Sequence, residues 1–323
     1  MPTYLVRRFA LALVTTVAAV ALTFALVHLA PGEPFLAGAE ERFVPPETIA
    51  RLRRDFGLDR PLAAQFARYV ANVARGDLGE SFTRRRPVAA VIGETLPATL
   101  LLGGVALALS FALGLGLGVV QARRAGGLAD AALSTVALAL ASVPAFWLGL
   151  MLLLVFGEWL HWLPVAGMTD AVAGPSRGWL ALSLDVARHL VLPALTLALV
   201  NAATVARFHR AAMLEALGAD FVRAARARGL AEARILAAHA FRAALAPAIA
   251  LAGLSVPALL TGSVLVESVF GWPGMGRVAY EAIFARDYNV VTGVTVVAAV
   301  LVAVGSLLAD IGVAAADPRV RRA

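Results

Sequence analysis

The sequence predicts an all-α integral membrane protein with six transmembrane helices. Of its 323 residues, 60% are hydrophobic and only 15% are charged, whereas soluble domains lie nearer one half and one quarter. A helix needs about 20 predominantly apolar residues to cross a hydrocarbon core of about 30 Å. Six stretches of about that length follow one another along the chain: 9–30, 96–120, 131–156, 190–206, 248–266 and 290–313.

The first apolar stretch, 9–30, follows Arg7 and Arg8 and admits two interpretations. A cleaved secretory signal has an apolar core of roughly 7–15 residues, and this stretch is longer, so an uncleaved first span is favoured. Residues 1–94 then form the first predicted region, a span followed by a long extracytoplasmic loop. In that loop, 45–58 and 61–74 have the prolines and apolar spacing of two short amphipathic helices. These helices form a cap on the outer mouth or a docking surface for an external partner, and the two interpretations are compatible.

The five later stretches form a predicted core, residues 95–313, whose spans contain polar and helix-bending residues. Pro144, Pro193 and Pro257 predict kinks, and the spacing Gly114-x-x-x-Gly118 predicts a close helix–helix contact. Polar side chains are costly in lipid and therefore face protein or a cavity. The polar residues within these spans either hydrogen-bond between helices or line a translocation path. They are Asn201, Thr204, Ser255, Thr261, Ser263 and Glu267.

The distribution of arginine predicts that both chain ends lie in the cytoplasm. With that orientation, fourteen arginines fall in cytoplasmic segments and four in the short outer loops, as the positive-inside rule requires. The loop 31–94 holds ten arginines, but loops longer than about 60 residues are largely exempt from the rule. The main cytoplasmic segments are then the long loop 207–247 and the tail 314–323.

The composition excludes several kinds of chemistry. The chain has no lysine, so it cannot contain the P-loop motif G-x-x-x-x-G-K-[ST], and any ATP hydrolysis would occur on another chain. It has no cysteine, and its five histidines show no metal-ligand spacing. No G-x-S-x-G nucleophile motif surrounds a serine. The sequence therefore predicts no catalytic, cofactor or metal site on this chain, and its net charge of +7 fits contacts with the lipid bilayer rather than with nucleic acid.

The most distinctive polar feature is a basic, alanine-rich stretch within the predicted cytoplasmic loop 207–247. On a helical wheel it has two faces, with Phe221, Val222 and Ala225 on one and Arg223 and Arg226 on the other. Gly229 follows as the glycine that commonly ends a helix. A second helical stretch, 231–245, then leads to Pro247 and the fifth span. The stretch is therefore predicted to form a helix–glycine–helix hairpin, or alternatively a basic helix lying on anionic head groups.

The segment 206–247 resembles the cytoplasmic EAA loop of ABC-transporter permeases of the dipeptide, oligopeptide and nickel class. Its sequence is ARFHRAAMLEALGADFVRAARARGLAEARILAAHAFRAALAP. Three further segments resemble the same class, and they are RGDLGESF at 75–82, VESVFGWPGMGRVAYEAIFARDY at 266–288 and DPRVR at 317–321. Two positions depart from it, because Arg223 stands where the general motif has glutamate and Asn289 stands where the class often has proline. The resemblance covers nearly the whole chain in order.

The resemblance implies a type I ABC importer permease fold in the cytoplasmic (inner) membrane of a prokaryote. Such a permease imports di- or oligopeptides, or a related solute such as nickel. Its partners are a homologous permease, two cytoplasmic ATPase subunits that bind ATP and Mg²⁺, and an extracytoplasmic solute-binding protein. Its loop is a coupling helix that inserts into a cleft on the ATPase. Carried onto this chain, the small residues that permit close approach are Ala224, Ala225 and Gly229, and the side chains that meet acidic or polar groups are Arg223, Arg226 and Arg228.

Three other functions fit the sequence less well. An autonomous secondary transporter usually has inverted repeats and intramembrane charges, but the chain shows no clear internal repeat and only Glu267 near a span. A membrane-embedded enzyme lacks a catalytic constellation here. A membrane anchor leaves the polar residues within the spans unexplained.

Overall fold

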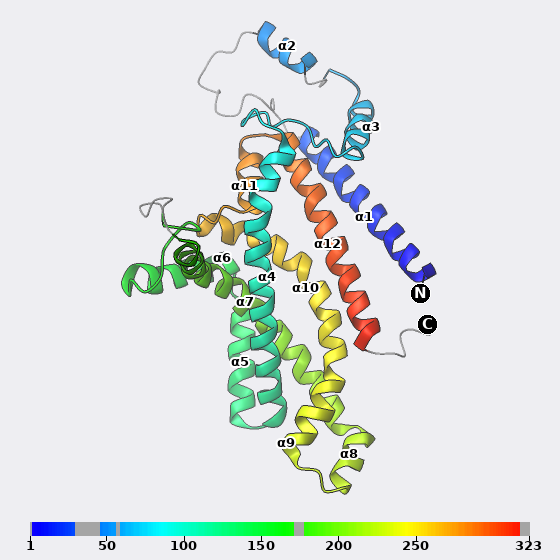
Figure 1. The fold of residues 1–323 in the computed structure, drawn as a ribbon, viewed down its shortest axis with the longest axis vertical. Coiled ribbons are helices and arrows are strands. Elements are labelled where there is room, and N and C mark those ends of the chain that lie inside the picture. The colour runs from blue at the N-terminus through cyan, green and yellow to red at the C-terminus, as the bar shows by residue number, and fades with distance from the viewer. Residues whose placement is uncertain (1, 30–45, 56–58, 171–177, 317–323) are drawn as a thin grey trace. The chain divides into compact units, whose positions relative to one another are not determined.

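A computed structural model describes residues 2–29, 46–55, 59–170 and 178–316 (Figure 1). Within these ranges the chain is helical, and its only β pairing is an isolated bridge between Glu80 and Pro87. The predicted all-α class is therefore confirmed. The chain divides into two compact units. The split unit comprises Pro2–Ala98 and Gly274–Ala303, and the central unit comprises Thr99–Pro273 and Val304–Ala323.

The split unit contains the N-terminal helix, two short helices from the long loop, and parts of two long helices. The short helices begin at or directly after a proline, Pro46 and Pro61, a residue that fits the first turn because it has no amide proton to leave unpaired. Both match the helices predicted at 45–58 and 61–74. The helices of this unit are α1 (Pro2–Leu29), α2 (Pro46–Asp55), α3 (Leu62–Val73), the start of α4 (Val88–Arg123), α11 (Met275–Phe284) and the start of α12 (Tyr288–Ala316).

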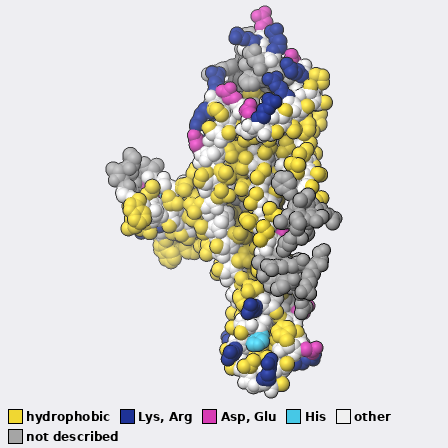
Figure 2. Space-filling view, turned by 45° about the vertical axis from the view of Figure 1, so that its right-hand side comes forward, with side chains coloured by type: hydrophobic (Ala, Val, Ile, Leu, Met, Phe, Trp, Pro, Cys, Tyr) yellow, Lys and Arg dark blue, Asp and Glu magenta, His cyan; other side chains and the backbone are white. Residues whose placement is uncertain are grey.

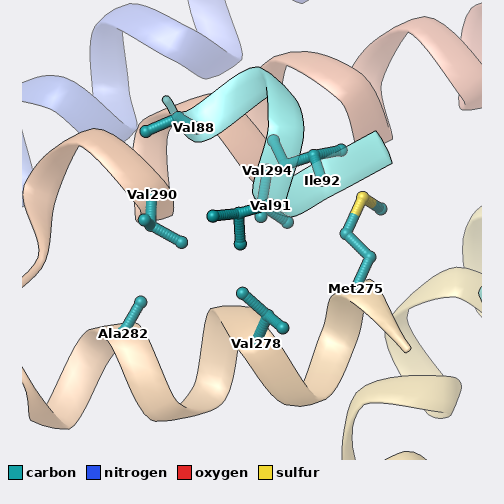
Figure 3. Packing of buried hydrophobic residues seen from close by; sticks show 8 residues of the cluster. All are labelled: Val88, Val91, Ile92, Met275, Val278, Ala282, Val290 and Val294. Atoms are coloured by element: carbon teal, nitrogen blue, oxygen red, sulfur yellow. The ribbon is translucent and has the colours of Figure 1, made fainter. Parts of the chain in front are cut away.

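The core of the split unit is built from aliphatic side chains of α4, α11 and α12 (Figure 3). Its buried members are Val88, Val91, Ile92, Met275, Val278, Ala282, Val290 and Val294. Most are valines, which keep few side-chain rotamers in a helix, so they pack with little further loss of freedom. A Cβ added to Gly293 would lie 2.6 Å from Val88 Cγ1. The close approach of α12 to α4 therefore depends on glycine at this position.

One predicted span in the central unit is broken. Residues 131–156, predicted as one helix, form α5 and then a second segment, α6 with the π-helical η1, at an angle of 103°. Pro144 lacks an amide proton and restricts Val143 to an extended conformation, so the helix cannot continue. The helices of this unit are the rest of α4, α5 (Leu128–Ser142), α6 (Ala145–Leu152), η1 (Leu153–Trp159), α7 (Trp179–Gly218), α8 (Asp220–Ala227), α9 (Glu232–Arg234), the π-helical η3 (Ile235–Ala240), α10 (Phe241–Val269) and the end of α12.

Several helices extend beyond the predicted apolar stretches. α7 has 40 residues where 190–206 was expected, and α4 begins at Val88 rather than at 96. Apolar composition marks only the part of a helix that suits lipid, while good helix formers such as Ala, Leu and Arg continue the helix on either side. Pro247, expected just before the fifth span, lies inside α10, because this helix also begins before its apolar stretch.

Four of the described helices are long and apolar enough to cross a membrane, or five if α5 and α6–η1 form one bent span. The apolar part of α1, Leu13–Leu29, is shorter. The chain is therefore a multi-pass membrane protein, while the count of six spans and the side on which the loop 31–94 lies stay predictions. The segments 30–45, 56–58, 171–177 and 317–323 lie outside the described residues, and the last of these contains DPRVR.

The close contact predicted at Gly114 and Gly118 is confirmed within the central unit. A Cβ added to Gly114 would lie 2.5 Å from Val205 Cβ, and one added to Gly118 would lie 3.0 Å from the Ala206 carbonyl oxygen. A Cβ on Gly116, in the same stretch, would meet no described atom within 4 Å. α4 therefore approaches α7 through the face that carries Gly114 and Gly118, as small residues allow in membrane helices.

Candidate functional site

The arginine-rich hairpin of the central unit consists of α8, a glycine turn and α9 with η3 (Figure 1). At the end of α8, the Gly229 N–H donates to the Arg226 carbonyl at 2.9 Å, and the Leu230 N–H donates to the Ala225 carbonyl at 3.3 Å. These two bonds form a Schellman motif, which requires a residue in the left-handed conformation. Gly229 supplies it with a φ of +77°. The prediction that Gly229 ends the helix is confirmed.

A small apolar core holds the two arms of the hairpin together. Val222 and Ala225 on α8 and Ile235 on the other arm are fully buried, and Leu230 packs against them. Leu230 directly follows the glycine, which is where a Schellman motif places its apolar contact. Phe221, expected on the same face as Val222, is instead 44% exposed. The hairpin is thus amphipathic, as predicted, but its buried face is narrower than the sequence indicates.

The predicted small contact residues of the hairpin differ in exposure. Ala225 is buried, so its methyl group packs inside the hairpin and faces this chain. Ala224 and Gly229 are exposed, and a Cβ on Gly229 would meet no described atom within 4 Å. Of the three predicted small contact residues, Ala224 and Gly229 therefore lie on the surface of the hairpin.

The predicted arginines are all exposed on the hairpin. Figure 2 shows basic side chains at the lower end of the view. Arg226 Nε donates to Glu232 Oε1 at 2.7 Å and so joins the two arms; this hydrogen bond raises the pKa of the Arg226 guanidinium. Arg223 pairs with Asp220 on the same helix, and Arg228 Nε donates to a backbone carbonyl of α8 at 3.3 Å. Exposed pairs add little stability, so these contacts orient the guanidinium groups more than they hold the fold.

Three of the six predicted path residues bond to their own helices. Asn201, Ser255 and Ser263 each donate to a backbone carbonyl three or four residues earlier, at 2.9 Å. Such bonds satisfy a polar side chain without a neighbouring helix. Thr204 is half-buried on α7, and the side chain of Thr261 lies outside those that the structure describes.

Glu267 is the predicted path residue that connects two helices. It is fully buried on α10, and its Oε1 accepts a hydrogen bond from Thr99 Oγ1 on α4 at 2.9 Å. Acidic side chains in membrane helices usually face the protein interior and bond there, as this one does. Among the described residues, no group of three or more His, Cys, Asp or Glu side chains is placed to hold a metal ion. Glu267 therefore belongs to no such group within the described ranges.

A partly buried ion pair between α5 and α7 was not anticipated from the sequence. Arg210 Nε donates to Asp130 Oδ1 at 2.8 Å, and Arg210 Nη2 donates to Asp130 Oδ2 at 2.7 Å. The Gly126 N–H adds a third bond to Oδ2 at 3.0 Å. Asp130 directly precedes the predicted span 131–156, and Arg210 closely follows the predicted span 190–206. Both were therefore expected on the same side of the membrane, but that shared side alone does not single out this pair among the charged residues there.

Two of the family-like segments meet in the split unit. Asp287 is completely buried, and its Oδ2 accepts bonds from the Ser81 hydroxyl at 2.5 Å, the Thr83 hydroxyl at 2.8 Å and the Thr83 N–H at 3.1 Å. Nearby, Asn289 Nδ2 donates to the Glu80 carbonyl at 2.8 Å. A proline at 289 could not make that bond, because it has no side-chain donor. Sequence resemblance identifies the two segments separately, and their contact emerges only from the fold.

Similarity to known proteins extends along the whole chain. Residues 114–322 match the family described as the binding-protein-dependent transport system inner membrane component, and residues 1–103 match the N-terminal part of such membrane components. The chain is 40% identical over 333 residues to the di/tripeptide transport system permease protein DppB of Pseudomonas aeruginosa (strain UCBPP-PA14), with 99% of each chain covered. It is 36% identical over 335 residues to the dipeptide transport system permease protein DppB of Escherichia coli (strain K12), with 98% of each covered.

The fold is shared with solved ABC transporters. An inward-facing methionine ABC transporter, MetNI, matches with a TM-score of 0.54 at 20% identity, over 70% of this chain and 96% of that chain. An amino acid ABC transporter matches with a TM-score of 0.51 at 17% identity, over 69% and 92%. The fold is that of a multi-pass membrane protein. The chain belongs to the binding-protein-dependent transport system inner membrane components, and it is a permease subunit of an ABC importer.

Proposed function

We propose that this chain imports short peptides as one of two permeases in an ATP-driven transporter. The observation that carries the proposal is its similarity, over 99% of both chains, to a permease named for di- and tripeptide transport. A permease named for dipeptide transport matches over 98% of both chains. Because the coverage is nearly complete, the proposal rests on the whole chain rather than on a single motif.

The hairpin is the proposed site of coupling to a cytoplasmic ATPase. Its exposed Ala224 and Gly229 allow close approach, and the charges that meet acidic or polar groups of the partner belong to Arg223, Arg226 and Arg228. The chain has no lysine for a P-loop, so ATP and Mg²⁺ bind to two ATPase subunits. This assignment puts the hairpin and both chain ends in the cytoplasm.

The complete transporter contains, in this proposal, a homologous permease and an extracytoplasmic solute-binding protein as well. The peptide path runs past the polar groups of the spans, which are Asn201, Thr204, Ser255, Thr261, Ser263 and Glu267. A hydroxyl that donates to its own helix, as Ser255 and Ser263 do, keeps acceptor lone pairs. Both serines are buried in this structure, at 8% and 1% exposure, so they can accept bonds from the N–H groups of a passing peptide once the helices around them move apart.

Coupling is tested by enlarging the exposed alanine of α8. The Ala224→Tyr variant is reconstituted in proteoliposomes with the partner permease, both ATPases and the binding protein, and uptake of labelled L-Ala-L-Phe and ATP hydrolysis are measured. We expect normal insertion but loss of most uptake and of most binding-protein-stimulated hydrolysis, because a large side chain disrupts a closely packed interface. Ala125→Tyr, at an exposed alanine in the turn between α4 and α5, is the matched control and retains both activities.

Other outcomes separate the parts of the proposal. Full uptake by Ala224→Tyr would show that the hairpin is not the coupling site. Uptake by the permeases without any ATPase would favour a secondary transporter. Hydrolysis that responds to another solute and never to peptides would leave the coupling assignment intact and overturn the peptide assignment.

A further inference from the structure

A cavity of about 330 Å³ lies in the split unit beside α3. Its walls come from α1, α3, the segment 77–82 and the start of α12, and Figure 1 shows α3 beside the end of α1. The centroids of the Phe24 and Tyr69 rings, one from each helix, are 5.9 Å apart. Small-molecule sites have volumes of roughly 300–1,000 Å³, so this cavity suits a small ligand.

Side chains of both charges line the cavity. Arg60 and Arg68 lie just before and within α3, while Asp77 and Glu80 come from the segment that follows. In the part of the chain that the structure describes, neither arginine forms an ion pair with a carboxylate. A guanidinium binds a carboxylate through two parallel hydrogen bonds, so both arginines can take a carboxylate ligand. Asp77 Oδ1 accepts the Gly79 N–H at 2.9 Å, and a carboxylate retains further acceptor sites for an ammonium group.

Aromatic rings supply the apolar part of the wall. Phe24 is 7% exposed, and both it and Tyr69 line the cavity. Burial raises the pKa of the Tyr69 phenol, so its hydroxyl keeps its proton at neutral pH and can donate. The faces of such rings contact apolar side chains and also attract ammonium groups.

We infer that this cavity binds a short zwitterionic peptide. Its carboxylate binds Arg60 and Arg68, its ammonium group lies near Asp77 and Glu80, and an apolar side chain contacts the aromatic wall. The inference rests on the proposed import of peptides and gives that function a subsite outside the spans. A simple anion would complement only the two arginines and a simple cation only the two carboxylates, whereas a ligand that carries both charges can complement both pairs.

Binding of the dipeptide L-Ala-L-Phe to the full chain in lipid nanodiscs tests the inference. The measurement is isothermal titration calorimetry on the wild type, Arg68→Gln and Arg75→Gln. Arg75 is exposed just after α3 and does not line the cavity, so its variant is the matched control for the lost charge. We expect Arg68→Gln to bind about tenfold more weakly or worse, as loss of a bond between charged groups implies, and Arg75→Gln to bind as the wild type does. L-Ala-L-Phe amide, which lacks the carboxylate, should bind the wild type as weakly as the dipeptide binds Arg68→Gln.

Several results would overturn the inference. They are equal binding of the dipeptide and its amide by the wild type, equal loss in both variants, and no binding by the wild type at millimolar peptide. The amide comparison needs no variant, so it holds even where a variant fails to fold. Binding of the dipeptide in phosphatidylglycerol discs, together with no binding of the dipeptide in phosphatidylethanolamine discs, would assign the cavity to a lipid head group instead. Peptide uptake by the complete complex without peptide binding here would leave the proposed function standing and remove only this subsite.

Discussion

Asp130 and Arg210 join α5 to α7 through two hydrogen bonds of 2.8 and 2.7 Å. The Asp130 side chain is 6% exposed and the Arg210 side chain 31%, so the carboxylate is enclosed while the guanidinium reaches the surface. A two-point pair fixes the rotation of its partners as well as their distance. Because α7 leads into the hairpin after the single residue Ala219, this pair also positions the helix that carries the hairpin.

Removing the Asp130 carboxylate should lower thermal stability. In Asp130→Ala, Arg210 and the Gly126 N–H lose the carboxylate to which both donate, and hydrogen bonds to a charged group are stronger than neutral ones. We expect the Tm of the purified chain in detergent to fall by several degrees. Asp220→Ala, which breaks the exposed pair with Arg223, is the control and should leave Tm nearly unchanged. Equal losses of Tm in the two variants would contradict the structural role of the pair between Asp130 and Arg210.

The stability change on replacing a glycine of α4 by alanine should depend on how close the neighbouring atoms lie. In Gly114→Ala the new methyl group would lie 2.5 Å from Val205 Cβ, so α4 and α7 must separate, at a cost of about 1–3 kcal/mol in the free energy of unfolding. Gly116→Ala meets open space and should be neutral or stabilising, because alanine favours a helix. Unfolding in mixed detergent–SDS micelles measures both. If Gly116→Ala lowered the free energy of unfolding as much as Gly114→Ala, the close contact between Gly114 and Val205 would be contradicted.

The turn of the hairpin should depend on the backbone conformation of Gly229. Gly229→Ala meets no neighbour, so its cost comes from the left-handed φ of +77° alone and should be about 1–2 kcal/mol. Faster hydrogen–deuterium exchange at the Leu230 amide would report the loosened turn. Gly218→Ala, at the last helical residue of α7 and also in open space, should cause no such change. Unaltered exchange in Gly229→Ala would rule out the Schellman turn.

Loss of the Asp287 carboxylate should lower the stability of the split unit more than loss of any one of the groups that donate to it. Asp287→Ala leaves the donors of Ser81 and Thr83 without their shared acceptor and should cost about 3 kcal/mol in the free energy of unfolding, because bonds to a charged group are strong. Ser81→Ala removes one donor and should cost about half as much. Unfolding in mixed detergent–SDS micelles compares the two, and the reverse order would contradict the described network.

Sequence reasoning succeeds where a property is local. Hydropathy marks the membrane helices, apolar spacing marks α2 and α3, and the position of Gly229 marks the end of α8, because each depends on residues within one or two turns. The contact at Gly114 and Gly118 was also predictable, since two glycines four residues apart lie on one face of a membrane helix and let a second helix approach there. Helix lengths were underestimated, because polar residues continue a helix as well as apolar ones do.

Sequence reasoning fails where partners are distant along the chain. Pro144 indicates a kink, but not that the chain would leave at 103°. Asp130 and Arg210, or Ser81 and Asp287, each meet across long sequence intervals, and no periodicity connects them. The exposure of Phe221 and the burial of Ala225 likewise depend on how the second arm of the hairpin packs, which a wheel drawn for one helix does not contain.

The length of α7 has a mechanical consequence. At about 1.5 Å per residue, its 40 residues span about 60 Å along the helix, twice the thickness of a hydrocarbon core of about 30 Å, and Pro193 interrupts the hydrogen bonds within it. Val205, where α4 touches it closely, lies about 20 Å from the end at Gly218 and about 39 Å from the end at Trp179. If the stretch from Pro193 to Gly218 turns about that contact as a lever, its second arm is about 18 Å long, so a push on the hairpin arrives at Pro193 about equal in size and reversed in direction.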